Sequence, residues 1–329
     1  MRRIWADRQF NVLLGINILV FVAAFLLAGR SFVDPYNLQS MAAQVPEIGL
    51  LALGVMLAMV SGNGGIDLSG IALANLSAVT ATLLVRPWVS ADQAPVLFSL
   101  TFAAAALLVG LIGGMLNGFL IGRTGLTPII ATLGTQLFFT GIAVALTNGS
   151  AITLGYIEPL DNFGNSSIFG VPECFALFAA IALVLGAVLR FSAFGVRLYL
   201  LGTNPKAARY AGIAQTRILF VTYTLCGLLA SVAGVTISAR TSSAKWDYGS
   251  SYVLIAILIA VMAGVRPQGG YGRVVCVVLS AVALQVFASL FNFLSISNFF
   301  RDMAWGLLLL LFLASSQVDP RIWLARQRA

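Results

Sequence analysis

The sequence contains no histidine among its 329 residues, and only 9% of its residues are charged. Histidine-based catalytic triads, histidine metal sites and histidine proton relays are therefore excluded. Lysine occurs only twice, as Lys206 and Lys245, and neither lysine follows a G-x-x-x-x-G-K-[ST] loop, the pattern that binds nucleotide phosphates. If the protein uses ATP, another chain must hold the nucleotide.

Cysteine is also scarce. Cys174, Cys226 and Cys276 are widely spaced, lie in or beside apolar runs and form no C-x-x-C pair. An odd number of isolated cysteines argues against a disulfide framework, and we expect these side chains to serve as small apolar packing groups.

Apolar residues make up 60% of the chain, and the mean hydropathy is +0.97. Soluble domains contain about 45–50% apolar and about 25% charged residues, so the composition indicates a polytopic membrane protein. A spanning helix needs about 20 mostly apolar residues, because lipid cannot satisfy exposed backbone groups. We expect an all-α protein in which residues 1–329 form a single transmembrane domain with ten spans, at 11–29, 41–61, 65–85, 96–122, 127–147, 173–191, 217–239, 250–265, 272–296 and 302–317.

The basic residues predict the orientation. With a cytoplasmic N-terminus and ten crossings, the cytoplasmic segments hold 14 of the 19 Lys and Arg residues and the external segments hold five, while most acids, Glu47 among them, fall outside. This distribution follows the positive-inside rule and places both termini in the cytoplasm. The net charge of +8 is then a topology signal, and we expect no nucleic-acid partner.

Ten spans divide into two sets of five, and an odd number of crossings reverses direction. We therefore expect two inverted five-helix halves, an arrangement common in transporters. The basic start followed by the run Val12–Ala28 has two interpretations, a cleaved signal peptide or a first span. Because the run is long and no small-x-small cleavage site follows it, we expect it to be retained.

Two long loops connect the spans. The external loop, residues 148–172, is rich in Gly, Asn, Ser and Pro, and is either a simple connector or a cap that contacts an external partner. The cytoplasmic loop, residues 190–217, is the most basic part of the chain. Within it Asn204 and Pro205 predict a helix start, residues 206–211 a short helix and Gly212 its end. That helix either rests on anionic lipid or inserts into a groove on a cytoplasmic partner.

A glycine-rich break, residues 61–65, separates the second span from the third and is followed by Asp67. An ionisable residue in a span is costly and is a functional candidate. We expect a discontinuous helix with Asp67 at its N-terminal end, where the carboxylate either caps the helix or gates a solute. Other polar groups in the spans suit either a path for a hydroxylated solute or contacts between helices, and with Asp67 we take as pathway candidates Ser69, Asn75, Asn117, Thr132 and Gln136.

Three separated motifs carry a family resemblance. Residues 64–69 read G-G-I-D-L-S, residues 117–121 and 128–134 read N-G-F-L-I and P-I-I-A-T-L-G, and residues 195–213 read G-V-R-L-Y-L-L-G-T-N-P-K-A-A-R-Y-A-G-I. In this order they resemble the signature, the N-G-x-L-I…P-x-I-x-T-L-G block and the coupling segment of ribose-type ABC importer permeases, a sugar group within the superfamily that also includes branched-chain amino acid permeases.

The resemblance implies a permease subunit in a bacterial inner membrane that imports a sugar or sugar-like solute. It implies a second permease, identical or related, two cytoplasmic ATPases that hold ATP and Mg²⁺, and an external solute-binding protein, with no cofactor on this chain. It assigns ATPase coupling to Gly202, Asn204, Ala207, Ala208, Arg209 and Gly212, and a charge at Ala208 is expected to uncouple transport.

The eighth span departs from the family, which often begins it Y-E-L-D-A-I-A, whereas residues 252–257 read Y-V-L-I-A-I. No role of that acidic pair is carried over. Two competing functions remain. An ion-driven secondary transporter predicts charges buried in mid-span, and the sequence offers almost none besides Asp67. A membrane enzyme lacks the usual catalytic constellations, so we expect no catalytic residue and no metal site.

Overall fold

The computed structural model describes residues 8–317, which fold almost entirely into helices. The helices are α1 (Arg8–Ala28), η1 (Gly29–Val33), α2 (Pro35–Val60), α3 (Gly70–Val85), α4 (Pro95–Gly122), α5 (Pro128–Thr147), α6 (Glu158–Asn165), α7 (Glu173–Phe191), α8 (Ala193–Thr203), α9 (Pro205–Tyr210), α10 (Gln215–Thr241), α11 (Tyr252–Met262), α12 (Val274–Phe293) and α13 (Asn298–Gln317). Two antiparallel strand pairs join β1 (Ile152–Thr153) to β4 (Ser243–Ala244), and β2 (Ser167–Ile168) to β3 (Val171–Pro172).

Within residues 8–317, seven helical segments are long and apolar enough to cross a membrane, which makes this an all-helical polytopic membrane protein. They are Arg8–Val33, Pro35–Val60, Pro95–Gly122, Pro128–Thr147, Glu173–Phe191, Gln215–Thr241 and Val274–Phe293. The predicted spans 65–85 and 250–265 correspond to the shorter apolar helices α3 and α11. The predicted span 302–317 falls within α13, which is not one of the seven.

The helices α3 and α11 are short for the same reason. Each follows a long buried helix, α2 or α10, and in each case about ten residues of non-helical chain, 61–69 or 242–251, come first. In the first of these segments Gly62 and Gly64 have φ values of +84° and +67°. Such values strain other residues but not glycine, so the glycine-rich break ends α2 and delays the start of α3.

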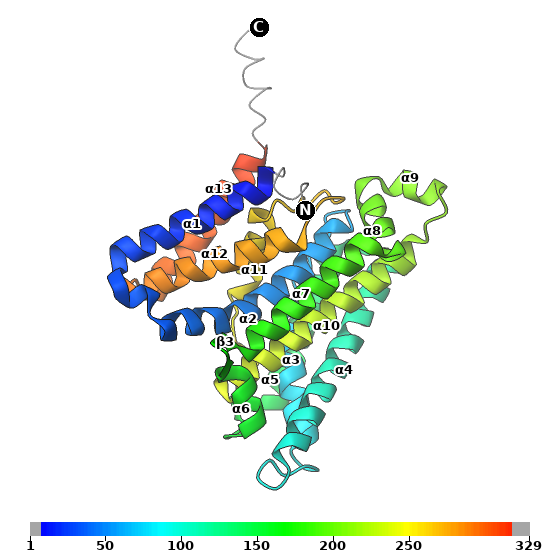
Figure 1. Ribbon diagram of the computed structural model, residues 1–329. Helices are drawn as coiled ribbons and strands as arrows, with labels where there is room; N and C mark the ends of the chain where they lie inside the picture. Colours follow the sequence, from blue (N-terminus) through cyan, green and yellow to red (C-terminus); the bar gives the residue numbers. More distant parts are fainter. Residues whose placement is uncertain (1–7, 318–329) are drawn as a thin grey trace.

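The long helices α2 and α10 lie at the centre of the molecule (Figure 1). Glycines allow α4 to approach α10 closely: a Cβ added to Gly114 would lie 2.6 Å from the Tyr223 carbonyl oxygen, and one added to Gly227 would lie 2.3 Å from the Gly110 oxygen. Close backbone approach through small residues is a principal way of packing helices in lipid, where no hydrophobic effect drives them together.

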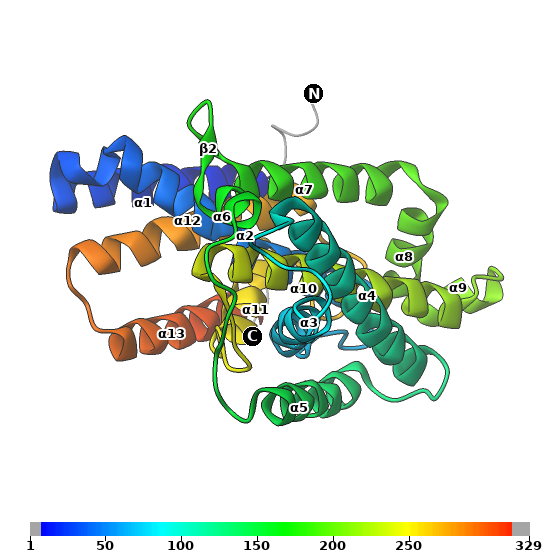
Figure 2. The ribbon, with the colours of Figure 1, turned by 90° about the horizontal axis from the view of Figure 1, so that it is seen from below.

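The helical bundle has two distinct ends. In Figure 1, α6 lies at one end and α8 and α9 project from the other, with α2, α7 and α10 running between them. Figure 2 shows α1, α12 and α13 on one side of this central group and α4 and α5 on the other. The two long loops predicted from the sequence, which contain α6 and α9, therefore lie at opposite ends of the molecule.

Candidate functional site

The segment 61–69 runs back into the bundle beside α2. Asp67 lines a small cavity together with Leu51 and Gly54, which lie two turns before the end of α2. α3 thus starts inside the bundle instead of at its surface, and the predicted discontinuous helix is confirmed.

Asp67 is 6% exposed and lies just before the first turn of α3. Its Oδ1 accepts hydrogen bonds from the Ser69 backbone N–H at 2.9 Å and from the Ser69 hydroxyl at 2.7 Å. A carboxylate that accepts from the backbone two residues on is a local turn that fixes the start of a helix. The carboxylate thus orders the turn before α3, whose N-cap residue is Ser69. The choice between capping and gating stays a prediction.

A chain of hydrogen bonds continues from this turn across two further helices. The Asn117 amide of α4 donates to the Ser69 hydroxyl at 2.8 Å, and the Thr135 hydroxyl of α5 donates to the Asn117 side-chain oxygen at 2.7 Å. Thr132, one turn earlier on α5, has its hydroxyl 3.0 Å from the Ile66 carbonyl oxygen. Buried polar networks whose members are paired rigidify a structure, so these residues hold the start of α3 against α4 and α5.

The two remaining pathway candidates lie elsewhere. Asn75 of α3 donates through its amide to the carbonyl oxygens of Trp246 at 3.1 Å and Tyr248 at 2.9 Å. It therefore supports the non-helical segment before α11. Gln136 is half-buried on α5, outside this network. Of the six candidates, the structure joins Asp67, Ser69 and Asn117 in one hydrogen-bonded chain with Thr132 beside it.

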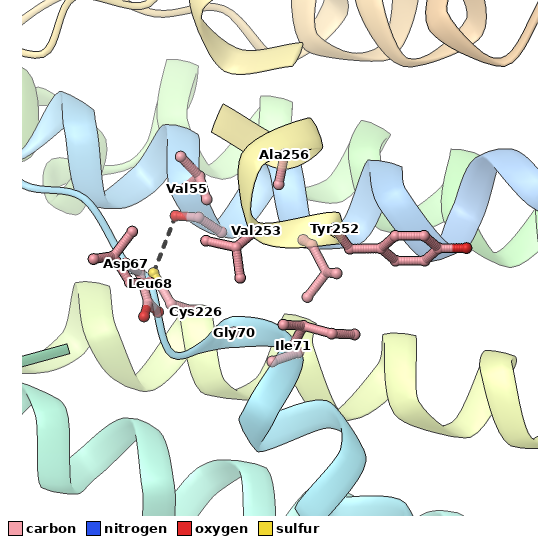
Figure 3. Close-up of a pocket in the computed structure, with 12 residues that line it drawn as sticks. Val55, Asp67, Leu68, Gly70, Ile71, Cys226, Tyr252, Val253 and Ala256 are labelled. Carbon is pink, nitrogen blue, oxygen red and sulfur yellow. Dashed lines mark hydrogen bonds between the residues drawn. The ribbon is translucent and has the colours of Figure 1, made fainter. Parts of the chain in front are cut away.

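The starts of α3 and α11 meet at a cavity between α2 and α10. Figure 3 shows Asp67 from the segment before α3, Gly70 and Ile71 from α3, and Tyr252, Val253 and Ala256 from α11. The Cys226 thiol of α10 donates to the Gly54 carbonyl oxygen at 3.2 Å on its wall. The cavity volume is about 10 Å³, room for at most about one water molecule. The molecule is closed to a solute at this level.

A buried charged cluster lies beside this cavity and was not predicted. Glu47 is 1% exposed in α2, and its carboxylate forms an ion pair with Arg240 of the last turn of α10. The Tyr252 and Tyr248 hydroxyls donate to Glu47 Oε2 at 3.0 Å and 3.4 Å. Glu47 therefore lies inside α2, where α10, α11 and the segment before α11 supply its partners. Its placement among the external acids stays a prediction.

The coupling segment contains the short helix predicted after Asn204, which is α9, and a second helix, α8, that was not predicted. The Asn204 side chain accepts from the Ala207 backbone N–H at 3.0 Å and so caps α9, Pro205 occupies the first turn, and Gly212 has a φ of +75° where the chain leaves the helix. Asn204, Ala207, Arg209 and Gly212 are exposed, whereas Ala208 is 4% exposed and packs inward. A charge at Ala208 would therefore disturb the folding of α9 directly, and Ala207 presents the surface available to a partner.

Gly202 joins α8 to the rest of the molecule. A Cβ added there would lie 1.9 Å from the Val60 carbonyl oxygen and 2.5 Å from the Gly270 nitrogen. The same Gly270 N–H donates to the Val60 oxygen at 3.0 Å. The end of α8, the end of α2 and the loop before α12 thus meet backbone to backbone, and Gly202 is a packing residue instead of a surface contact.

Tyr199, one turn earlier on α8, strengthens this junction. Its hydroxyl donates to the Gly272 carbonyl oxygen at 2.7 Å. Burial raises the pKa of the Tyr199 hydroxyl above its usual value, so the donor stays protonated at neutral pH. The hydrogen bond of Tyr199 and the backbone contact of Gly202 therefore both fix α8 to the loop before α12.

With this geometry established, the chain can be compared with known proteins. The sequence profile of the family described as "Branched-chain amino acid transport system / permease component" matches residues 37–314. The chain belongs to this family. It is accordingly a permease component, a transport subunit and not itself an enzyme.

Curated relatives of the permease share most of its length. The ribose import permease protein RbsC of Bacillus subtilis is 34% identical over 92% of this chain and 91% of its own. RbsC of Escherichia coli K12 is 32% identical over 90% of each chain, and the autoinducer 2 import system permease protein LsrD of Photorhabdus luminescens is 30% identical over 85% of this chain and 84% of its own. No solved structure matches the permease significantly.

Part of the Glu47 cluster could have been found from the sequence. Glu47 falls inside the predicted span 41–61, and an acid inside a span is itself a functional signal. Its partner Arg240 is 193 residues away in sequence, and no local pattern reveals that pairing. The permease has no acid among residues 253–256 at the start of α11, yet Tyr252 there contacts a carboxylate supplied by α2.

Proposed function

We propose that the protein is the membrane-spanning permease subunit of an ATP-binding-cassette importer for a sugar or sugar-like solute in a bacterial inner membrane. The names of its full-length relatives, which import ribose and autoinducer 2, support this solute class. The observation that carries the proposal is the exposed helix α9, tied through Gly202 to the segment that starts α3. Such a link can pass movement from a cytoplasmic partner to the centre of the spans.

The proposed assembly divides the work among chains. Two cytoplasmic ATPases hold ATP and Mg²⁺, a second permease completes the pathway, and an external binding protein delivers the solute. Residues 190–217 form the cytoplasmic coupling loop and residues 148–172 the external loop. Their location at opposite ends of the bundle supports this assignment (Figure 1).

We propose ten crossings, with both termini in the cytoplasm and two inverted halves. The third and eighth spans of the predicted order are α3 and α11, which hold equivalent places in the two halves. Both are short, both follow a non-helical segment and both start at the same cavity. Interrupted helices in corresponding positions of inverted halves are typical of transporters and mark the transport pathway.

The coupling step follows from the close backbone packing of Gly202 against Val60 and Gly270, which we call the glycine junction. Movement of α9 is carried by α8 to Gly202, whose backbone contacts the end of α2 and the loop before α12. Since the segment 61–69 continues from that contact to Asp67, displacement there moves the start of α3 and opens or closes the small cavity. The pathway residues thus act by positioning α3, with exchangeable hydrogen bonds available to a hydroxylated solute once the halves separate.

An ion-coupled secondary transporter is the alternative, and the buried Glu47–Arg240 pair is the observation in its favour. A charge pair in a span can serve ion coupling. Two tyrosine hydroxyls, however, donate to the Glu47 carboxylate and hold it in place beside Arg240. Uptake into proteoliposomes separates the two functions: the importer requires its ATPase and ATP, whereas a secondary transporter works with the permease alone and an ion gradient.

Substitution of Ala207 tests the coupling role. We expect Ala207→Glu to reduce co-purification of the ATPase in mild detergent and ATP-driven uptake at least about tenfold, which corresponds to about 1.4 kcal/mol of lost contact. Insertion and thermal unfolding are expected to be unchanged, because the side chain is exposed. Ala151→Glu adds the same charge in the exposed external loop and is the control. Normal ATPase association of Ala207→Glu would overturn the role of α9.

A further inference from the structure

A layer of polar side chains lies between the small cavity and the α6 end of the bundle. Glu47 of α2 lies one turn before Leu51 and Asn75 of α3 lies one turn after Ile71, and both Leu51 and Ile71 line the cavity. The helix α2 ends at the junction with α8, whereas the end of α3 packs in the apolar cluster that contains α6. Glu47 and Asn75 therefore lie on the same side of the cavity, toward α6.

This layer holds the non-helical chain before α11 and the first turn of that helix. The Asn75 amide donates to the carbonyl oxygens of Trp246 and Tyr248. The hydroxyls of Tyr248 and Tyr252 donate to the Glu47 carboxylate. The start of α11 is thus held by side chains of α2 and α3, which are far away in sequence.

Tyr252 connects the polar layer to the cavity. It lines the cavity, and Figure 3 shows its ring extending away from Cys226 and Asp67. Its hydroxyl lies 3.0 Å from Glu47 Oε2. Cys226, which lines the same cavity, is 2% exposed. A solute that enters the cavity from the α6 end has to pass this layer.

The hydrogen bonds of the layer are incompletely satisfied. The Tyr248 hydroxyl lies 3.4 Å from Glu47 Oε2, which is long for a bond between two oxygens. The buried Nε of Arg240 has no hydrogen-bond partner within residues 8–317. A polar network rigidifies a structure fully only when every member is paired. The α8 side, by contrast, is closed by backbone packing at the glycine junction, so the α6 side is where the start of α11 is released more readily.

We propose that Glu47, Asn75, Tyr248 and Tyr252 form the external gate of the transport pathway, with residues 242–251 and the start of α11 as its moving part. Release of their hydrogen bonds separates α11 from α2 and α3 and widens the cavity toward the α6 end. A hydroxylated solute offers the carboxylate the same kind of donor as the tyrosines, so opening exchanges hydrogen bonds instead of abandoning them. The external direction rests on the proposed function, which includes the orientation of the bundle.

The accessibility of Cys226 tests the gate whatever the solute is. Cys174→Ala and Cys276→Ala leave Cys226 as the single thiol, since the chain contains three cysteines. The full-length permease is produced together with its ATPase, and a membrane-impermeant methanethiosulfonate is added either to intact cells or to inverted membrane vesicles. Intact cells present the external face and inverted vesicles the cytoplasmic face. With the gate residues unchanged, we expect slow labelling from both faces, because the cavity holds at most about one water molecule.

Two variants remove the hydrogen bonds of the gate and keep its bulk. Tyr248→Phe combined with Tyr252→Phe deletes both hydroxyls, and Asn75→Leu deletes the amide while keeping a side chain of similar size. Each should raise the external labelling rate of Cys226 about tenfold or more, because the buried acceptors lose their donors. Labelling from the cytoplasmic face should not change. Tyr156→Phe, which removes an exposed hydroxyl in the external loop, is the matched control and should alter the rate less than about twofold.

The side from which Cys226 is labelled separates a gate from a general loss of stability. A variant that merely loosens the fold exposes the thiol to both faces, and such a result would overturn the gate, as would a rise from the cytoplasmic face alone. Unchanged external labelling in the tyrosine double variant or in Asn75→Leu would also refute it, and so would an equal rise in Tyr156→Phe. Co-purification of the ATPase is scored on the same preparations. Its failure with external labelling as expected would contradict the proposed function and leave the gate intact, so the two failures are distinguishable.

Discussion

At the scale of single residues, the ion pair between Glu47 and Arg240 is the costliest feature of the buried interior. Taking two charges out of water carries a penalty that only close pairing and further hydrogen bonds offset. Here Arg240 and the hydroxyls of Tyr248 and Tyr252 supply them. The cluster joins α2, α10 and the start of α11, so its integrity bears on how those three segments stay together.

We predict that Glu47→Gln and Arg240→Gln are each strongly destabilising, by about 3–5 kcal/mol, because each leaves a buried charge without its partner. The double variant should recover at least half of that loss. Thermal unfolding of the purified subunit and of the three variants provides the double-mutant cycle. Strictly additive effects would show that the two charges do not stabilise each other.

A second residue-scale prediction concerns Asp67. Because an amide oxygen can still accept from the Ser69 N–H and hydroxyl, Asp67→Asn should retain the turn before α3 and keep ATP-driven uptake within about threefold of the unmodified protein. Asp67→Ala removes the acceptor and should cost about 0.5–2 kcal/mol of stability. A loss of uptake beyond tenfold in Asp67→Asn, with unchanged thermal unfolding, would instead establish that the negative charge itself gates the solute.

At the scale of elements, the sequence predicted the positions of the helices well because hydropathy is a local property. The cap of α9 at Asn204 and its end at Gly212 were equally local and are confirmed. What could not be predicted depends on distant contacts. The inward orientation of Ala208, the close packing of Gly202 and the pairing of Glu47 are all decided by segments far away in sequence.

The glycine junction yields a prediction at this scale. In Gly202→Ala the new methyl group would overlap backbone atoms of Val60 and Gly270, which cannot rotate away as side chains can. We expect a loss of about 1–3 kcal/mol in stability, as for other overpacked sites. ATPase association should be kept while uptake per ATP falls. Gly15→Ala, where a Cβ meets nothing within 4 Å, is the control. Normal uptake per ATP in Gly202→Ala would remove the junction from the coupling path.

At the scale of the whole molecule, the orientation proposed from charge can be tested through the two loops. Ser167 lies exposed in the external loop and Ala211 lies exposed after α9, while the three native cysteines are buried. In a background with those cysteines replaced, we expect Ser167→Cys to react with a membrane-impermeant maleimide on intact cells. Ala211→Cys should react only after permeabilisation.

The two labels also test the number of crossings between Ser167 and Ala211. A single helix misassigned between them would put both cysteines on the same side, because each crossing reverses the direction of the chain. Labelling of Ser167→Cys only after permeabilisation would place residues 148–172 in the cytoplasm. The basic end of the bundle would then be external, contrary to the positive-inside rule. The coupling role of α9 would then fail, because a cytoplasmic ATPase could not reach it.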